Sequence, residues 1–462
     1  MMNGMNDTIY DLVIINGKII DVIKEIIANK NIGIIKGKIA VLTDKNIIGK
    51  IVIDAKGLVV SPGFIDFHSH VDGNLYSASC IVRQGGTTTL GGERNLNSKL
   101  IRKIEDEGFI INQGFSISQS FVLRRAVGVT NLNTAASKQE INAMVDLAKR
   151  FMEFGAFGIC FGLELVPGTS FEELLELSKV AKEYNRPILI HLRKDGREAL
   201  KCFDEIIKVS EETGVSIQIL QLMYMVGIGG TMPYALEIID NARQRGLDIT
   251  ADSGVYDAFS ACIGTGIFEK GWEKEYSNTS VNDLLISSGI HRGEYCNKEL
   301  FQYLRNEYPE TIVTAFVCDT EAIATALKKE YVFVSTNAAD GPFYPGIGAP
   351  EVSGSYPRLL GQFVRGEKII NLMEAIKKIT ILPAKRFGLK NIGSIEIGKN
   401  ADLVIFDKNK IIDKANFVGI GKPDAAPIGI KYVLVNGEIV VNKEGLTENR
   451  LSGRLIKYES VQ

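Results

Sequence analysis

The chain has 462 residues, a formal net charge of −2, 45% hydrophobic and 23% charged residues, which is the composition of a globular protein with a large core. No basic run stands out, which argues against nucleic acid or an anionic membrane as the main partner. The six cysteines lack paired spacing, the first residues lack the layout of a signal peptide, and no apolar run is long enough to span a membrane. We therefore expect a cytoplasmic protein with reduced thiols.

Both ends of the chain predict short β-strands. Residues 11–60 alternate apolar and polar positions between turns such as Asn16-Gly17 and Lys36-Gly37. Strands are again predicted at 401–407 and 432–441, the latter as a pair joined at Asn436-Gly437. Because both β-rich ends lie outside the central part, we expect residues 1–61 and 390–462 to pair into one β-sandwich domain.

The central part, residues 62–389, alternates short apolar strands with helical stretches. A helix is predicted to begin at Phe171, after Ser170 as its N-cap, and the last predicted strands are 312–317 and 331–336. About eight such β-α units predict the α/β class and a (β/α)8 TIM barrel, whose chemistry lies at the carboxyl ends of the strands. Residues 264–310 are expected to form an insertion that covers the site as a lid. His291 in that insertion is either a solvated loop residue or a group that enters the site on closure.

The most informative motif runs from Ser61 to His70, where Asp66, His68 and His70 share one face of a strand. Two neighbouring imidazoles at a strand end are suited to a divalent metal such as zinc. His191 also closes a predicted strand, so we expect the three histidines to converge on one ion. The alternative is a pair of histidines that lie two residues apart without binding anything.

These motifs resemble those of the amidohydrolase superfamily, and within it those of the D-aminoacylase branch. The resemblance spans nearly the whole chain and rests on the following segments: 61–70, 85–89 (GGTTT), 161–168 (FGLELVPG), 191–196 (HLRKDG), 249–252 (ITAD), 382–389 (LPAKRFGL), 398–404 (GKNADLV) and 435–437 (VNG). It implies a metal-bearing barrel with a β-sandwich, and the use of metal to activate water against an amide bond.

The chain departs from that branch at three positions of the metal centre. Where the resemblance implies a ligand cysteine, Glu93 is present, which could bind metal or pair with the neighbouring arginine. Gln221 replaces a ligand histidine and, as a poor zinc ligand, is reassigned to substrate contact. Asn337 aligns with the catalytic aspartate, so we expect Asp340, three residues on, to act as the base, unless it only caps an Asp-Gly turn. One divalent ion, zinc by default, is favoured over two.

The substrate-binding positions also differ. The branch uses cations to bind a substrate carboxylate, but the matching positions carry Met223 and Glu351. This removes the attraction for an anionic substrate and favours a neutral or cationic one. Arg193 could still hold an anion or could make a structural ion pair, and Tyr256 could face the substrate or pack in the core.

The expected function is therefore metal-dependent hydrolysis of an amide carbon–nitrogen bond in a small molecule, D-aminoacylase-like but not for a typical anionic N-acyl-D-amino acid. The expected ligands are His68, His70, His191 and Glu93, with Asp340 as the base. Two alternatives stay open: opening of a cyclic amide (as in hydantoinases and dihydroorotases) or deamination on the same scaffold, and a metal-free relative that acts in assembly or regulation. Assembly into a homo-oligomer is compatible with the sequence.

Overall fold

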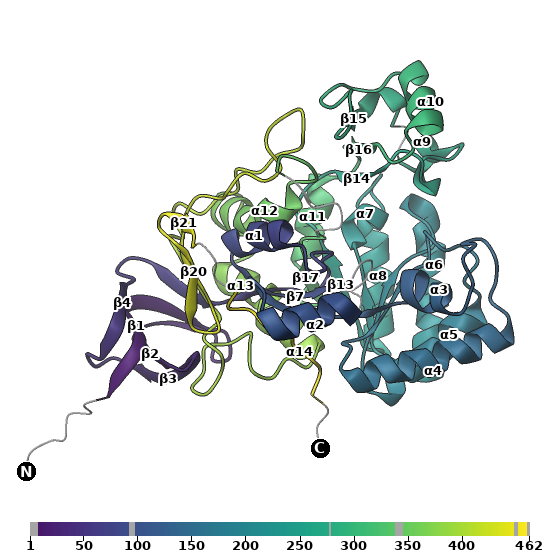
Figure 1. Cartoon of the computed structure of the whole chain (residues 1–462). Coiled ribbons are helices and arrows are strands. Elements are labelled where there is room, and N and C mark those ends of the chain that lie inside the picture. The colour runs from purple at the N-terminus through teal and green to yellow at the C-terminus, as the bar shows by residue number, and fades with distance from the viewer. Residues whose placement is uncertain (1–7, 92–97, 277–278, 338–344, 448–450, 460–462) are drawn as a thin grey trace, which may run out of the picture.

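Parallel strands form the centre of the molecule (Figure 1). The computed structural model describes residues 8–91, 98–276, 279–337, 345–447 and 451–459. One parallel sheet has three strands and the other has six: β6 (Phe64–Asp66), β7 (Gly86–Gly91) and β8 (Asn112–Phe115), then β9 (Ile117–Ser118), β10 (Ile159–Gly162), β11 (Ile188–His191), β12 (Ile217–Ile219), β13 (Ile249–Ser253) and β17 (Val332–Val334). Only Ser116 separates β8, the last strand of the first sheet, from β9, the first strand of the second. Across the two sheets the strands therefore follow one another in chain order. The alternation of these strands with helices confirms the α/β class.

The first and last of these strands are linked just beyond their carboxyl ends. The backbone N–H of Thr336 donates to Oδ1 of Asp66 at 3.1 Å. The N–H of Asn337 donates to the carbonyl oxygen of His68, also at 3.1 Å. The segments that follow β17 and β6 are therefore neighbours in space, although they lie at opposite ends of the central part.

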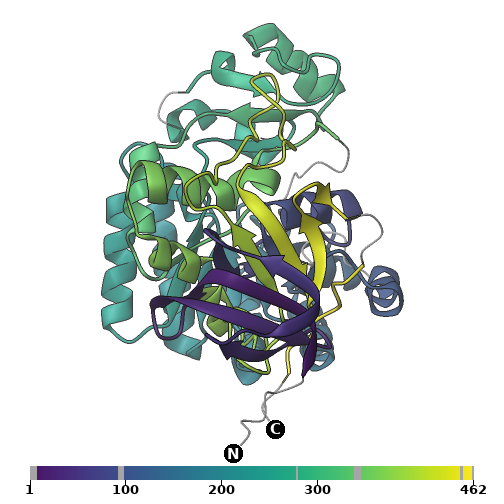
Figure 2. The same cartoon turned by 90° about the vertical axis from the view of Figure 1, so that its left-hand side faces the viewer.

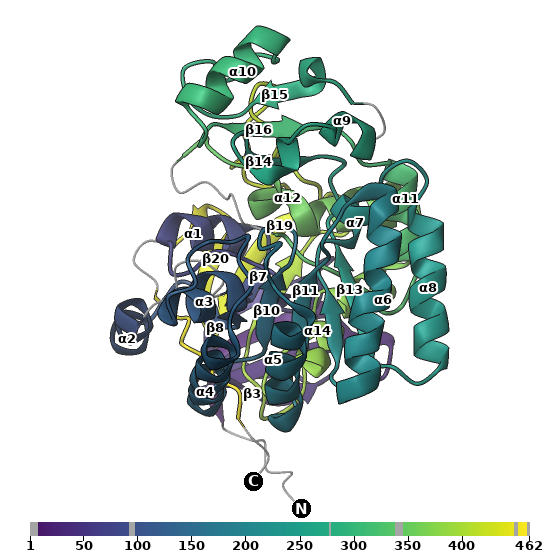
Figure 3. The ribbon, with the colours of Figure 1, turned by 90° about the vertical axis from the view of Figure 1, so that its right-hand side faces the viewer.

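Helices connect the strands and cover them from outside, as α4, α5, α6 and α8 do in Figure 3. In α4 the buried residues recur every three or four positions, at Ile141, Met144, Ala148 and Met152, which is the apolar stripe of a helix packed on a core. The helix start expected at Phe171 is confirmed, because the Ser170 side chain accepts from the N–H of residue 173. The helices are α1 (Leu75–Arg83), α2 (Ser98–Glu107), α3 (Arg124–Ala126), α4 (Lys138–Phe154), α5 (Phe171–Glu183), α6 (Gly196–Thr213), α7 (Leu222–Val226), α8 (Met232–Gln244), α11 (Thr320–Leu327), α12 (Glu351–Arg358), α13 (Leu372–Lys378) and α14 (Ile381–Arg386).

Strands from both chain ends share one nine-stranded sheet, drawn in purple and yellow in Figure 2. β5 joins the two halves, since it pairs in parallel with β1 through Val59 and antiparallel with β18 through Pro62. The strands are β1 (Ile9–Asp21), β2 (Ile26–Ile35), β3 (Lys38–Thr43), β4 (Ile48–Asp54), β5 (Val59–Pro62), β18 (Leu403–Phe406), β19 (Ile430–Val435), β20 (Glu438–Asn442) and β21 (Gly445–Leu446). Division into domains at residues 61 and 390 stays a prediction.

One predicted turn in this sheet is wrong. Asn16-Gly17 does not separate two strands but lies inside β1, where the register with β2 shifts as in a β-bulge. Asn16 has a positive φ of 60° and its N–H donates to the side chain of Asn31 at 3.0 Å. An Asn-Gly dipeptide is therefore part of a bulge at residues 16–17, whereas Asn436-Gly437 forms the expected turn between β19 and β20.

The insertion forms a small unit of its own, which projects from the parallel strands in Figures 1 and 3. It contains a three-stranded antiparallel sheet of β14 (Phe259–Cys262), β16 (Ile312–Ala315) and β15 (Leu284–Ile286), with α9 (Trp272–Glu275) and α10 (Lys298–Glu307). Residues 312–317 were expected in the barrel, and this is wrong, because 312–315 form the central strand of the small sheet. Among the described helices, none has the length and apolar character to cross a bilayer.

Candidate active site

His68 and His70 follow β6 and lie side by side in the interior. Their side chains belong to residues only 4% and 5% exposed, and the ring centroids are 5.8 Å apart in an edge-to-face arrangement. Nδ1 of His68 lies 2.9 Å from Oδ2 of Asp252, at the end of β13. A carboxylate that accepts from one ring nitrogen fixes the tautomer and leaves the other nitrogen for a metal.

Asp252 binds several groups at once. Its Oδ1 accepts from the backbone N–H of Gln221 at 2.6 Å, and its Oδ2 also accepts from the hydroxyl of Ser335. Gln221 ends the segment after β12 with a left-handed φ of 55° and begins α7. The Asp252 carboxylate thus ties the ends of β6, β12, β13 and β17 together.

The segment after β17 places Asn337 beside His68, through the hydrogen bond between Asn337 N and the His68 carbonyl. Oδ1 of Asn337 is buried, and no described group lies within hydrogen-bond distance of it. Nearby, burial raises the pKa of Asp66 to about 6, against hydrogen bonds from Thr336 that lower it. Two predicted site residues, Glu93 and Asp340, lie outside the described residues.

His191 ends β11 and lies with two acidic residues that the sequence analysis did not select. One ligand atom each of Glu164, His191 and Asp195 lies within 4.8 Å of the other two, and Nδ1 of His191 is 3.6 Å from Oε2 of Glu164. Within the described ranges, His68, His70 and His191 do not form such a group. Convergence of the three histidines on one ion therefore stays a prediction.

Glu164 and Asp195 could have been found in the sequence, because each follows a strand that ends at the same edge of the sheet. Asp195 is 7% exposed, and Tyr276 of the insertion donates its hydroxyl hydrogen to Oδ2 of Asp195. Burial raises the pKa of Asp195 well above its usual range, and the negative charge of Glu164 raises it further.

The guanidinium of Arg193 is held by neighbouring protein groups. Nε and Nη2 bind the two carboxylate oxygens of Glu205 at 2.7 and 2.9 Å, and Nη2 also donates to the carbonyl oxygen of Thr169 at 2.6 Å. This bidentate pair favours the structural alternative for Arg193 over the binding of a substrate anion.

Tyr256 is 2% exposed and packs into a junction with the chain's C-terminal part. Its hydroxyl donates to Oδ2 of Asp413 at 3.0 Å, and the guanidinium carbon of Arg358 lies 4.4 Å from the centre of its ring. Burial raises the pKa of Tyr256 well above its usual range, with Asp413 as the next cause. These contacts favour the core alternative for Tyr256.

The two positions where the branch uses cations are both buried. Met223 is fully buried in α7, and Glu351, 4% exposed, begins α12. Oε1 of Glu351 accepts from the hydroxyl of Tyr224 at 3.0 Å. The carboxylate of Glu351 thus lies in the interior with a neutral hydrogen-bond donor.

Neither His291 nor Cys318 has the surroundings of a catalytic group. His291 lies in a turn of the insertion, with Nδ1 3.2 Å from Oε2 of Glu294, as expected of a solvated loop histidine. Cys318 is buried, and burial raises the pKa of its thiol well above the usual range, so the nucleophilic thiolate is disfavoured.

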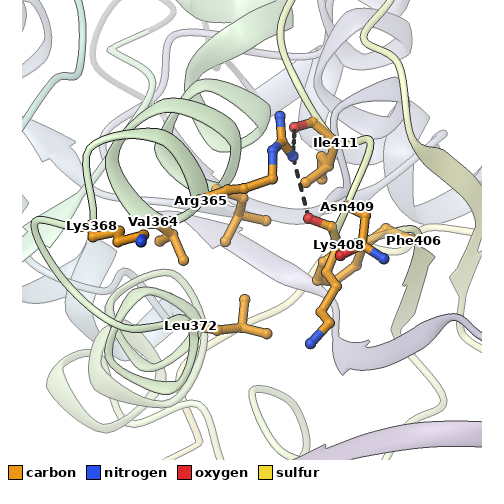
Figure 4. A pocket seen from close by; sticks show the side chains of 9 residues that line it. Val364, Arg365, Lys368, Leu372, Phe406, Lys408, Asn409 and Ile411 are labelled. Carbon is orange, nitrogen blue, oxygen red and sulfur yellow. Dashed lines mark hydrogen bonds between the residues drawn. The ribbon is translucent and has the colours of Figure 1, made fainter.

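A surface pocket lies apart from the predicted site residues and contains none of them (Figure 4). It lies between the segment Leu359–Gly366, α13 and the end of β18, and Arg365 closes one side. Nη1 of Arg365 donates to the carbonyl oxygens of Lys408 and Ile411 at 3.2 and 2.5 Å. We assign this pocket no part in the chemistry.

Comparison with known proteins finds relatives of the whole chain. Residues 344–441 match the model of the Amidohydrolase family. The chain is 26% identical to an N-acyl-D-glutamate deacylase of Alcaligenes xylosoxydans xylosoxydans, over 92% of this chain and 93% of that protein. It is 27% identical to a D-aminoacylase of the same organism, over 97% of both chains.

Among solved structures, an N-acyl-D-glutamate deacylase from Bordetella bronchiseptica, complexed with zinc and a phosphonate inhibitor, superposes with a TM-score of 0.85. The alignment covers 97% of this chain and all of that one at 23% identity, which shows the fold, a TIM barrel with an extra domain. The chain is therefore similar, over nearly its whole length, to the D-aminoacylase-like branch of the amidohydrolases, enzymes that hydrolyse carbon–nitrogen bonds other than peptide bonds.

Proposed function

We propose that this protein hydrolyses an amide bond of a small molecule with one divalent metal ion, zinc by default, held by His68, His70 and His191. The observation that carries the proposal is the buried pair of imidazoles at the end of β6, one of which is oriented by Asp252 at 2.9 Å. Imidazoles whose centroids are 5.8 Å apart fit as two ligands of one ion, with metal–nitrogen bonds of about 2 Å. A zinc complex of a relative with similar fold supports a divalent metal.

When bound, the metal polarises the scissile carbonyl and lowers the pKa of a water molecule toward neutrality. Asp252 accepts from Nδ1 of His68 and so presents Nε2 to the ion. We assign Asp340 as the base that takes the proton of the attacking water and delivers it to the leaving nitrogen. Asn337, which lies beside His68, cannot take that role because an amide does not accept a proton at neutral pH.

We infer that the group next to the scissile bond of the substrate is neutral or cationic. Met223 offers no charge, Glu351 offers a buried carboxylate, and the guanidinium of Arg193 is held by Glu205. None of these three positions thus offers an uncommitted cation to a carboxylate of the substrate. We also propose that the parallel strands close into a (β/α)8 barrel at the link between β17 and β6.

The first test is metal content together with activity, in wild type and in His68→Ala. His291→Ala is the matched control, because His291 is partly exposed in the insertion and pairs with Glu294. We expect purified wild-type protein to bind zinc, and His68→Ala to lose activity together with the equivalent of zinc held at the histidine pair, while the control keeps both. Wild type that takes up no metal after reconstitution would contradict the proposal.

The second test compares substrates of different charge. N-Acyl-D-glutamate is assayed beside neutral amides and beside amides with an ammonium group near the acyl nitrogen. We expect kcat/KM on the neutral or cationic compounds to exceed that on the anionic one by at least tenfold. Rapid hydrolysis of N-acyl-D-glutamate would refute the inference from Met223 and Glu351 that the substrate is neutral or cationic. It would not contradict the metal-dependent hydrolysis.

A further inference from the structure

Two carboxylates and one imidazole meet at the ends of two neighbouring strands, β10 and β11. Glu164 follows β10, His191 ends β11, and Gly162 of β10 is paired with His191 across the two strands. A ligand atom of each of Glu164, His191 and Asp195 lies within 4.8 Å of the other two. In a tetrahedral zinc site with bonds of about 2.0–2.2 Å, ligand atoms are about 3.3–3.6 Å apart, so side-chain movements of about 1 Å would complete the contact.

The orientation of Asp195 is the second observation. Asp195 is the N-cap residue of α6, a position where a carboxylate ordinarily accepts hydrogen bonds from the first amides of the helix. Its side chain makes no such bond, and Tyr276 holds Oδ2 instead. Oδ1 is buried in a residue that is only 7% exposed, and no described donor lies within hydrogen-bond distance of it. The carboxylate is thus turned from the helix toward His191 and Glu164.

The insertion contributes to this arrangement. Tyr276 is 2% exposed and follows α9, which contacts α6. In Figure 3 the small sheet of the insertion and α9 lie beyond one end of the barrel strands, and α6 runs below α9. Tyr276 therefore anchors one oxygen of Asp195 and leaves the other oxygen for a ligand.

We propose that Glu164, His191 and Asp195 form a separate binding site for a divalent transition-metal ion of the zinc class. Imidazole with carboxylates is a donor set that zinc and its neighbours accept, and two carboxylates in a mostly buried site favour a cation over a neutral ligand. The site does not need His68 or His70. It goes beyond the proposed function, which places its ion at those two histidines together with His191.

Because His191 is named in both proposals, the test leaves His191 intact and removes the other ligands of each site. The His68→Ala/His70→Ala double variant removes the histidine pair, and Glu164→Gln/Asp195→Asn removes the acidic ligands with little change of shape. The control is Glu198→Gln/Asp204→Asn, two exposed acidic residues of α6. The full-length proteins are dialysed against Zn²⁺ and analysed for metal, and Co²⁺ is added as a spectroscopic probe of coordination.

We expect the His68→Ala/His70→Ala variant to retain about one equivalent of zinc, one fewer than wild type, and to lose it when Glu164→Gln/Asp195→Asn is added but not when the control pair is added. The Co²⁺ absorption of the double variant should disappear with the same addition. No zinc in the His68→Ala/His70→Ala variant, or zinc that survives all four changes, would overturn the site. A different result would contradict the proposed function, namely that His68→Ala/His70→Ala holds as much zinc as wild type.

Should loss of the acidic residues impair folding, Tyr276→Phe provides a milder test. It keeps all three ligands and removes only the hydroxyl that holds Oδ2 of Asp195. In the His68→Ala/His70→Ala background we expect zinc affinity to fall about 10- to 100-fold, as for the loss of a group that orients a ligand. Unchanged affinity in a folded protein would count against the site.

Discussion

Nδ1 of His68 lies 2.9 Å from Oδ2 of Asp252, although 184 residues separate the two in the chain. Both groups are buried, with side chains 3% and 0% exposed, so the contact is shielded from water and salt. A buried carboxylate at this distance selects the tautomer of the imidazole that carries hydrogen on Nδ1. The opposite nitrogen, Nε2, is then the one that can bind a metal.

The first prediction concerns this pair. Asp252→Asn should lower the zinc affinity of the histidine site about 10- to 100-fold, because the amide no longer fixes His68 with a charged acceptor. Asp248→Asn is the control, since Asp248 lies just before the same strand but pairs with Arg386 at its other end. The measurement is a competition titration with a zinc chelator in the Glu164→Gln/Asp195→Asn background. Equal losses in the two variants would indicate a general weakening of the fold instead.

The second prediction tests whether Asp340 is the base, although Asn337 is the residue that aligns with the catalytic aspartate. Asp340→Asn should lower kcat at least about 100-fold, the usual contribution of a general base, with KM little changed. Adding Asn337→Asp should restore part of kcat, because residue 337 lies beside His68 and its φ of 44° is one that aspartate adopts. Full activity of Asp340→Asn on its own would exclude Asp340 as the base.

The third prediction concerns the junction at Tyr256. A Cβ added at Gly354 would lie 2.0 Å from the Tyr256 hydroxyl oxygen, far inside contact distance. Gly354→Ala should therefore lower the free energy of unfolding by about 1–3 kcal/mol, as overpacking does. Tyr256→Phe removes the oxygen, so the double variant should lose less than the sum of the two single variants. Urea midpoints of all four proteins measure this coupling, and simple additivity would mean that the clash is absent.

Local patterns were enough to place much of this site. His68 follows β6 and Asp252 lies near the end of β13, and parallel strands bring their carboxyl ends to one edge, so period and chain order suffice. The start of α5 at Phe171 was also predictable, because the N-cap and the acidic first turn are neighbours in sequence.

Features that depend on residues far apart in the sequence could not be predicted from local patterns. Residues 312–315 have the apolar run of a barrel strand, and only their antiparallel pairing with β14 and β15 decides that they belong to the insertion. Asn16-Gly17 has the composition of a turn, but the side chain of Asn31 stabilises a bulge there. The orientation of Asp195 depends on Tyr276, 81 residues further on.

Asp402, in the GKNADLV motif, joins three segments of the chain. Its carboxylate accepts from the backbone N–H of Asn436 at 2.7 Å and from the side chain of Asn112 at 3.3 Å. Asn112 belongs to β8, whereas Asn436 lies in the turn after β19, so these bonds connect the barrel strands to the sheet of the chain ends. Burial raises the pKa of Asp402 to about 6, although both hydrogen bonds lower it.

This raised pKa predicts how stability depends on pH. In the unfolded chain the carboxyl titrates near 3.8, so the folded protein holds its proton more tightly, and the contribution of Asp402 is greatest below pH 3.8 and lost as the pH rises through about 6. Relative to Asp402→Asn, which does not titrate, wild type should lose up to about 3 kcal/mol of unfolding free energy between pH 4 and pH 7.5. Asp44→Asn, an exposed aspartate after β3, is the control. Urea midpoints for the three proteins across this range give the comparison, and a constant difference between wild type and Asp402→Asn would show that the carboxyl is already ionised at pH 4.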